Sequence, residues 1–346
     1  MPQTLTARDH DPGLTPGRRL NRHWVVEQKI GIGGCAVVYA VRHLDSKRKA
    51  AAKVQLNSAN KKGPLHMELA VLKAMDRHPN LPELIEYGRT NEYTYLVMSL
   101  LGRNLGALRM DMPKQQFTRA TCVRVGLQAL QAIAHMHSKG YLHRDIKPGN
   151  FAIGAEGRAQ RTVHLIDFGL ARCYLLRPES GDRKLRRPRA KPLFRGTYRY
   201  CSAAVMSGID AGRCDDLCSL VYMLIEMYTG KLPWTGIKDK DEVRQLKVNT
   251  ADMTLFEKCP VQLRLIYKYV RSLEFSSDPD YNEIEQLFKQ IIAEKGYKHE
   301  APYDWEEGGK FFEHTQNKSA ADDMGWKRVD DELSQKDGEE DSGDDN

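Results

Sequence analysis

The sequence predicts an α+β fold in two lobes, a small β-rich lobe with one main helix followed by a larger, mainly helical lobe. Short runs of β-branched and apolar residues flank a glycine-rich turn over residues 24–54, which is typical of antiparallel strands. Apolar residues recur at spacings of three and four over 117–137 and again over 241–295, which is typical of helices. With 346 residues, 41% hydrophobic and 29% charged, the chain can bury a sizeable core.

Composition divides the chain into an arm, a folded part and a tail. Pro, Gly and Arg without periodicity predict that residues 1–22 are a flexible, basic arm. The folded part, 23–308, suits one domain of two lobes or two small domains, and we predict lobes at 23–101 and 102–308. The polar, acidic residues 309–346 are predicted to be a disordered tail.

The formal net charge of +7 is unevenly distributed along the chain. Residues 329–346 hold nine acidic side chains and one lysine, a net of −8, so the remainder carries +15. A basic body indicates anionic partners, which are nucleic acid, an acidic or phosphorylated protein, or a membrane surface. The acidic tail is most simply a solvated end, and the alternative is an intramolecular shield for the basic face.

Cysteine usage and hydropathy indicate the compartment. The seven cysteines are odd in number and scattered, with no C-x-x-C pair, which favours reduced thiols inside the cell. No apolar run reaches the roughly 18 residues of a membrane span, and the polar N-terminus lacks the apolar core of a signal peptide. We therefore expect an intracellular protein, cytoplasmic or nuclear, without a membrane span.

Two short motifs, HRDIKPGN and LIDFG, carry the chemistry of the chain. Phosphoryl transfer requires the attacking hydroxyl, the γ-phosphate and metal ions to be held in line. Asp145 can orient the hydroxyl and accept its proton, and Lys147 can reach the transferring phosphate. Asn150 and Asp167 supply oxygen ligands suited to Mg²⁺. Each motif alone is weak, but in this order and spacing they match the protein-kinase signature.

A glycine-rich turn precedes these motifs. Glycines let a backbone approach phosphates closely, although such a turn alone is most often a hairpin. The residues that we expect to cover the phosphates are Ile30, Gly31, Gly33 and Gly34. The third glycine of the kinase pattern is replaced by Ala36, which we expect to reduce loop mobility and turnover while ATP still binds.

A strand with a single lysine follows the turn. In the kinase pattern this lysine, here Lys53, grips the α- and β-phosphates and pairs with a helix glutamate, here Glu68. The simpler roles are an exposed strand residue for Lys53 and a solvated helix face for Glu68. The order of the motifs favours the paired arrangement.

An adenine pocket is predicted where the first lobe joins the second. By position, Met98 would lie at the back of the pocket, and backbone groups of Ser99 and Leu101 would meet the adenine edge. The faces of the adenine would be covered by Val38, Ala51 and Ala152. These apolar residues are equally explained as core, and only the order of the motifs favours the pocket.

With these motifs assembled, the chain resembles the casein kinase 1 superfamily, and within it most closely the tau-tubulin kinases. The resemblance covers about residues 22–308. It is carried by the runs LHRDIKPGNF, DFGLAR, FRGTYRY, DDL, GKLPW, IKDK and DWE. It implies a two-lobed kinase fold, dependence on Mg²⁺ and ATP, and phosphorylation of serine and threonine. It also implies a preference for acidic or already phosphorylated substrates.

Two residues outside the motifs are expected to organise the catalytic loop. In the kinase pattern Thr197 bonds Asp145 and Lys147 and so shapes a serine/threonine site. Asp216, which opens an apolar helical run, lies where a buried carboxylate can cap the backbone of the catalytic loop. A helix N-cap is the simpler role for Asp216, and it is compatible with that one.

Basic residues are concentrated after the second motif. Residues 183–191 contain six arginines and lysines and no acid, so they are a solvated loop, a site for acidic or phosphorylated substrate, or a nuclear-import signal. Nucleic-acid binding has less support, because no aromatic residues are interleaved for stacking. Arg199 matches the anion-site arginine of the family, and Arg244 or Lys247 would supply the second basic group. We expect a monomer with acidic or phosphorylated protein substrates.

Three functions are compatible with the sequence. An active serine/threonine kinase is favoured, because the predicted catalytic and metal-binding residues are all present. A catalytically weak pseudokinase or scaffold that binds nucleotide and partners is the main alternative. It is supported slightly by Ala36, by Cys218 and by Ala204, which replaces the asparagine of the superfamily. A basic nucleic-acid-binding protein is the third, and steep salt dependence of its affinity would reveal it.

Overall fold

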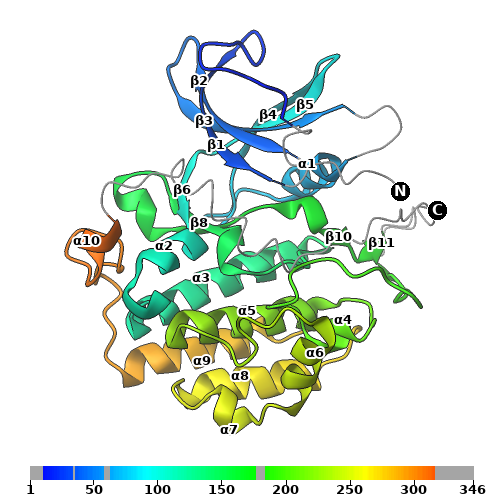
Figure 1. Ribbon diagram of the computed structural model, residues 1–346, viewed down its shortest axis with the longest axis vertical. Helices are drawn as coiled ribbons and strands as arrows, with labels where there is room; N and C mark the ends of the chain where they lie inside the picture. Colours follow the sequence, from blue (N-terminus) through cyan, green and yellow to red (C-terminus); the bar gives the residue numbers. More distant parts are fainter. Residues whose placement is uncertain (1–10, 34–35, 58–62, 177–183, 316–346) are drawn as a thin grey trace.

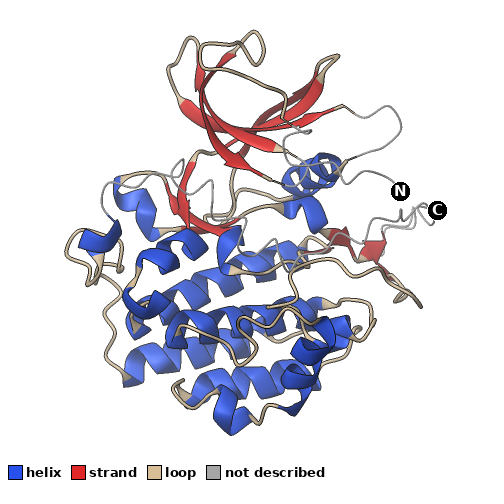
Figure 2. Cartoon of the chain, in the orientation of Figure 1, coloured by secondary structure: helices blue, strands red, loops and turns tan. Residues whose placement is uncertain are grey.

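A computed structural model describes residues 11–33, 36–57, 63–176 and 184–315. They form two lobes, as the sequence predicts: a small lobe built on a β-sheet, drawn at the top of Figure 1, and a larger helical lobe below it. Figure 2 shows the same division by secondary structure, with most strands in the small lobe and most helices in the large one. A short connection after β5 links the lobes.

Five antiparallel strands make the sheet of the small lobe, in the order β1-β2-β3-β5-β4. They are β1 (Trp24–Ile32), β2 (Val37–His43), β3 (Lys49–Leu56), β4 (Leu84–Arg89) and β5 (Tyr93–Met98). Alternating apolar residues such as Trp24, Val37 and Tyr39 form the buried layer of this lobe. Helix α1 (Pro64–Ala74), with proline in its first turn, packs against β4 and β5.

Residues 11–22 belong to the predicted flexible arm, but they pack against this sheet. Leu14 and Leu20 are buried in the core of the small lobe. The backbone N–H of Val26 in β1 donates to the carbonyl of Arg18 at 2.9 Å. The prediction of a flexible arm is therefore wrong for this part, because its two leucines bury apolar surface on the sheet. Residues 1–10 lie outside the described residues.

The core of the large lobe lies between α3 (Arg119–Ser138), which the apolar spacing predicts, and α5 (Arg213–Thr229), which contains the apolar helical run that Asp216 opens. The hydroxyl of Thr118 caps α3 by accepting from the N–H of Thr121, and Gly230, with φ of 85°, ends α5. The other helices are α2 (Leu105–Asp111), α4 (Ala203–Met206), α6 (Lys240–Asn249), α7 (Asp252–Leu255), α8 (Val261–Ser272), α9 (Tyr281–Glu294) and α10 (Phe312–Thr315).

Short strands at the junction of the lobes position the two motifs. They are β6 (Leu101–Asn104), β8 (Phe151–Gly154) and β9 (Val163–Leu165) in one sheet, β7 (Tyr141–Leu142) with β10 (Arg172–Cys173), and β11 (Leu175–Leu176) with β12 (Lys184–Leu185). The catalytic loop, residues 143–150, runs from β7 to β8. Residues 170–200, which we call the activation segment, begin just after the second motif and pair back onto β7.

The last described residues differ from the predicted disordered tail. Residues 309–315 include α10, which contacts α2, and Phe311 packs against the core of the large lobe. The prediction of disorder is thus wrong for these residues, because an aromatic side chain anchors them. The remainder of the tail, 316–346, lies outside the described residues.

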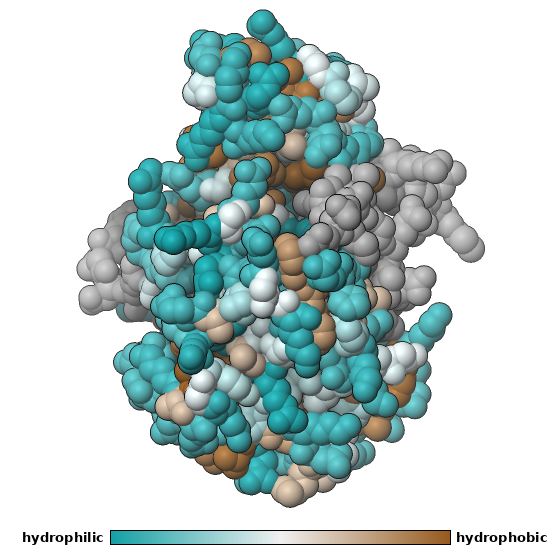
Figure 3. All heavy atoms as spheres, turned by 90° about the vertical axis from the view of Figure 1, so that its left-hand side faces the viewer, coloured by the Kyte–Doolittle hydropathy of each residue, from teal (hydrophilic) through white to brown (hydrophobic). Residues whose placement is uncertain are grey.

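One face of the protein is mainly polar. Figure 3 shows one face of the protein, on which hydrophilic side chains predominate and hydrophobic ones form small groups. Among the described residues, no helix combines the length and the apolar character that crossing a membrane requires. The six cysteines in this part of the chain are all free thiols.

Candidate active site

The catalytic loop is anchored by a buried carboxylate of the large lobe. Asp216, in the first turn of α5, accepts hydrogen bonds from the backbone N–H groups of His143 at 2.7 Å and Arg144 at 2.8 Å. Its side chain also lies 2.9 Å from His137 Nε2. The predicted capping of the loop by Asp216 is confirmed. Burial would raise the pKa of Asp216, but His137 and the loop N–H groups hold it below its usual value.

Four predicted catalytic residues meet at the Asp145 carboxylate. The hydroxyl of Thr197 donates to Asp145 Oδ1 at 2.7 Å and accepts from Lys147 Nζ at 3.0 Å. Lys147 Nζ also lies 3.0 Å from Asp145 Oδ2. The amide of Asn150 donates to the same oxygen at 3.0 Å and to the Asp145 carbonyl at 2.7 Å. Asp145 is thereby held in one orientation, with a cation beside it, as the proton acceptor of a bound hydroxyl requires.

A second cluster joins the small lobe to the start of the activation segment. Lys53 Nζ donates to Glu68 Oε2 at 2.5 Å and to Asp167 Oδ1 at 2.7 Å. Burial would lower the pKa of Lys53, but the charges of Asp167 and Glu68 outweigh it and raise that pKa. Lys53 is therefore a fixed cation. A kinase transfers phosphate only when this lysine–glutamate pair and the metal-binding aspartate are both in place.

The backbone directs Asp167 toward Lys53. Asp167 has φ of 66°, in the left-handed region that non-glycine residues rarely adopt. The next residue, Phe168, is fully buried, and its ring lies 5.7 Å from that of His143 in an edge-to-face contact. Packing of Phe168 under the catalytic loop thus compensates the strained conformation that orients Asp167.

Asn150 and Asp167 fit the divalent metal ion that a kinase binds. The amide nitrogen of Asn150 is committed to Asp145, so its carbonyl oxygen is the atom that can contact a cation. The side chain of Asp167 keeps 36% of its surface exposed although one oxygen meets Lys53. Both provide the hard oxygen ligands that Mg²⁺ prefers.

Strand register brings predicted nucleotide-binding residues to one end of the small lobe. Gly31 pairs with Val38, and Val38 pairs with Lys53 on the next strand. Ala51 pairs with Met98 across β3 and β5. Residues of β1, β2, β3 and β5 that are far apart in sequence therefore lie side by side across the sheet.

The glycine turn and the connection between the lobes are only partly described. The N–H of Gly33 donates to the carbonyl of Ala36 at 2.8 Å, and Ile30 lies partly buried in β1, whereas Gly34 lies outside the described residues. Beyond β5, the backbone N–H of Ser99 donates to Glu83 O at 3.0 Å, which leaves the Ser99 carbonyl as the group available to an adenine. The other predicted pocket residues lie on paired strands, Leu101 on β6 and Ala152 on β8.

The three residues predicted for a substrate anion site have different environments. Arg199 lies 3.6 Å from Glu226, with its side chain 12% exposed, and Arg244 is exposed and pairs with Asp241 at 3.4 Å. Lys247 is buried, so its assignment to an anion site is corrected. Its ammonium donates to two backbone carbonyls, both at 2.5 Å, and therefore secures the end of the activation segment.

The structure also places charged residues that the motifs did not predict. Glu226, wholly buried in α5, accepts from the hydroxyl of Tyr200 at 2.5 Å. Asp210, on the connection between α4 and α5, pairs with Arg189 of the activation segment at 2.9 Å. The sequence does contain one feature that could have singled out Asp210. It is the only acidic residue between Asp182 and Asp215, in a strongly basic stretch.

Comparison with known proteins identifies the family of this chain. The model of the protein kinase domain matches residues 24–297. The chain belongs to the protein kinase family. A kinase domain uses ATP with a divalent metal ion, and the two clusters around Asp145 and Lys53 lie within the matched range.

Relatives of this kinase domain are named as serine/threonine kinases. It is 36% identical over 294 residues to a Dictyostelium discoideum protein named a probable serine/threonine-protein kinase, covering 85% of this chain and 58% of that protein. It is 38% identical over 295 residues to a Caenorhabditis elegans protein with a similar provisional name, covering 85% and 84%. The chain thus spans little more than half of the first relative and most of the second.

Proposed function

We propose that this protein transfers the γ-phosphate of ATP to serine or threonine of protein substrates. The observation that carries the proposal is the joint presence of two assembled clusters, Lys53–Glu68–Asp167 and Asp145–Lys147–Thr197. A scaffold that only binds partners has no requirement for either arrangement. Their coexistence supports catalysis rather than binding alone.

In the proposed reaction each residue has one task. Asp145 accepts the proton of the substrate hydroxyl, and Thr197 holds that carboxylate in position. Lys147 and Lys53 neutralise negative charge on the phosphates, and Glu68 keeps Lys53 in place.

The nucleotide and its metal ion have their own proposed ligands. Asn150 and Asp167 hold Mg²⁺, which when bound neutralises and orients the phosphates. The glycine turn covers the phosphates, and Met98, Ser99 and Leu101 contact the adenine.

For the substrate we propose acidic or already phosphorylated segments, as in the casein kinase 1 superfamily and its tau-tubulin kinases. The basic body of the chain supports this. Of the residues predicted to bind the substrate anion, Arg199 and Arg244 are retained in the proposal, whereas Lys247 is committed to the backbone. We place this activity in the cytoplasm or nucleus.

A catalytically weak nucleotide-binding scaffold is the second candidate. The observation that favours it is Ala36, which closes the glycine turn with a methyl group and is 5% exposed. Slow opening of this turn would limit nucleotide exchange.

The deciding experiment measures transfer of radiolabelled γ-phosphate from Mg·ATP to casein by the wild type and by Asp145→Asn. The variant should keep its fold and lose at least about a thousandfold in rate, because general-base catalysis contributes up to about 10⁴-fold. Label from the wild type alone supports the kinase. Thermal stabilisation by ATP without label from either protein supports the scaffold. Equal label from both proteins contradicts the assignment of Asp145.

A further inference from the structure

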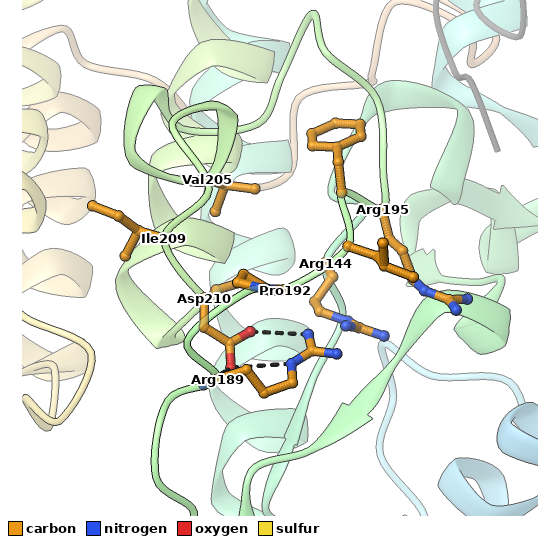
Figure 4. A pocket seen from close by; sticks show the side chains of 10 residues that line it. Arg144, Arg189, Pro192, Arg195, Val205, Ile209 and Asp210 are labelled. Atoms are coloured by element: carbon orange, nitrogen blue, oxygen red, sulfur yellow. Dashed lines mark hydrogen bonds and ion pairs between the residues drawn. The ribbon is translucent and has the colours of Figure 1, made fainter. Parts of the chain in front are cut away.

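Arginines from two segments converge beside the catalytic loop. Arg144 belongs to the loop itself, whereas Arg172, Arg189 and Arg195 belong to the activation segment. Figure 4 shows Arg144, Arg189 and Arg195 around a small cavity with Asp210 at its side. Burial, and after it the charges of the other three arginines, lower the pKa of Arg144. A cluster of this kind repels itself unless an anion is built into it.

Asp210 is that anion. Its two oxygens accept from Arg189 Nη2 at 2.9 Å and Nε at 3.3 Å, in the two-pronged geometry that suits a guanidinium and a carboxylate. The backbone N–H of Arg189 donates to the same carboxylate at 2.9 Å, and Arg172 lies 3.8 Å away. The Asp210 side chain is only 2% exposed, so solvent hardly screens these interactions.

The described residues of the activation segment around Arg189 offer no site for an alternative anion, and Ser180, the nearest preceding residue that can be phosphorylated, lies outside the described residues. Residues 181–196 contain no serine, threonine or tyrosine, so no residue of this stretch can be phosphorylated there. Tyr174, the nearest tyrosine in the preceding residues, is buried, and its hydroxyl donates to the carbonyl of His137 at 2.7 Å. The cavity among the arginines measures about 20 Å³, which is enough for a water molecule but not for a phosphate group.

The ion pair lies a short way along the chain from the catalytic carboxylate. Seven residues after Arg189 the backbone reaches Gly196, with φ of 113°, where an added Cβ would lie only 2.5 Å from the carbonyl oxygen of Arg144. The segment therefore packs directly on the catalytic loop. The next residue, Thr197, donates to Asp145 at 2.7 Å. Displacing the segment at Arg189 would thus move a hydrogen-bond partner of the proposed base.

We propose that Asp210 is a positioning residue that holds the activation segment in place through Arg189, in the role that a phosphate plays in kinases activated by phosphorylation of this segment. The expected effect on the rate of phosphate transfer rests on the proposed kinase function. The expected effect on local opening of the activation segment does not depend on that function. The kinase should be active without any phosphate on its activation segment.

Three variants test this role. Asp210→Asn keeps the size of the side chain and removes its charge, and Asp210→Glu restores the charge. Arg189→Gln breaks the same ion pair at its more exposed member. If Asp210→Asn fails to fold, Arg189→Gln still tests whether the pair positions the activation segment. The matched control is Asp278→Asn, which removes an exposed aspartate that pairs with Arg213 at 2.6 Å outside the activation segment.

Two readouts separate positioning from general stability. The first is kcat and KM for casein, which we expect to show a loss of about 10- to 100-fold in kcat for Asp210→Asn and Arg189→Gln, with KM for ATP changed less than about twofold. The second is the rate of tryptic cleavage in native conditions after Arg195, scored by mass spectrometry. This rate should rise at least about fivefold, because proteolysis follows local opening of the segment. Asp210→Glu should recover most of both properties.

The outcomes distinguish the two proposals. Wild-type cleavage and wild-type kcat in folded Asp210→Asn, or equal effects of Asp278→Asn, would overturn the role of Asp210. If the wild type transfers no phosphate, the proposed function fails, and the cleavage rates still decide whether Asp210 holds the segment.

Phosphatase treatment provides an independent test. Wild-type protein, shown by mass spectrometry to carry no phosphate, should keep its kcat when assayed at once. Loss of activity on dephosphorylation, with recovery after incubation in ATP, would show that a phosphate rather than Asp210 holds the segment.

Discussion

The catalytic loop and the activation segment lie against each other, but different sets of charged side chains hold their backbones. In the catalytic loop, the Asp216 carboxylate accepts two backbone N–H groups. In the activation segment, cations donate to backbone carbonyls, Arg144 to Leu170 at 2.8 Å near its start and Lys247 to Tyr198 at 2.5 Å near its end. The backbone of the catalytic loop is therefore fixed by an anion, whereas that of the activation segment is fixed by cations near its two ends and by the Asp210 anion in its middle.

The two segments also differ in how deeply they are buried, and this difference predicts how much each contributes to the stability of the fold. Asp216 is almost wholly inside the large lobe, so the catalytic loop is part of the core. Residues 184–195 of the activation segment are exposed or partly exposed, and Arg189 among them pairs with the buried Asp210. Changes at Asp216 should therefore reduce both stability and activity, whereas changes in the activation segment should reduce activity with a smaller loss of stability.

The largest effect among the anchors is expected for Asp216→Asn. The amide has one acceptor oxygen, so it cannot serve both N–H groups of the catalytic loop, and His137 loses its charged partner. Removing one partner from a buried charge network costs about 3 kcal/mol of unfolding free energy. Urea unfolding followed by circular dichroism measures this loss. Asp241→Asn, at an exposed position, should change the unfolding free energy by less than about 0.5 kcal/mol.

The pH dependence of this effect has a defined sign. Because the folded pKa of Asp216 lies below the unfolded value of about 4, its stabilisation is complete above that value and is lost as the pH falls through the folded pKa. The stability difference between wild type and Asp216→Asn should stay constant between about pH 5 and pH 8 and shrink below about pH 4. A difference that grows on acidification would contradict the assigned direction.

A smaller effect is expected where the small lobe meets the activation segment, for Glu68→Gln. The neutral amide leaves Lys53 paired with Asp167 alone, and a hydrogen bond between charged groups is worth about 2 kcal/mol. We therefore expect kcat/KM for ATP to fall about 30-fold, with a loss of unfolding free energy of up to about 2 kcal/mol, since Lys53 keeps Asp167 as a partner.

Glu27→Gln is the control for this substitution. It removes a half-exposed glutamate of the same lobe, which pairs with Arg42 at 2.8 Å. Equal losses in the two variants would mean that general charge, not the position of Lys53, sets the rate.

Lys247→Met tests the cationic anchor at the end of the activation segment. The thioether fills similar space but leaves the carbonyls of Tyr198 and Cys201 without their donor. We expect losses of about 1 kcal/mol in unfolding free energy and about fivefold in kcat/KM for casein. The exposed Lys238→Met should leave both values unchanged. A gain in stability would show that burying the ammonium costs more than its two hydrogen bonds contribute.

The sequence predicted the catalytic loop more fully than the activation segment. Asp145 and Asn150 stand five residues apart in one motif, because metal binding and proton transfer restrict both residue type and spacing. Asp216 was predicted because it opens an apolar helical run. Lys53 and Glu68 pair as the order of the motifs indicates.

Ion pairs between residues far apart in the chain were harder to predict from the sequence than the motifs. Arg189 was one of several basic residues in its stretch, and its partner Asp210 lies 21 positions away with no motif around it. Lys247 was predicted as a basic group of a substrate anion site, yet it is buried and donates to the carbonyls of Tyr198 and Cys201. Leu14 and Leu20 are too widely spaced to show a period, so their burial on the sheet could not be predicted.

The smallest effect is expected at the glycine turn, a backbone segment held by a neutral hydrogen bond between Gly33 and Ala36. Ala36→Gly removes a methyl group and adds backbone freedom to this turn. The variant should lose about 0.5 kcal/mol of stability, since glycine increases the entropy of the unfolded chain. We expect kcat and KM for ATP each to rise no more than about twofold, because a looser turn releases nucleotide faster. Steady-state kinetics with casein would check this, and a tenfold or larger rise in kcat would mean that Ala36 is what limits this kinase.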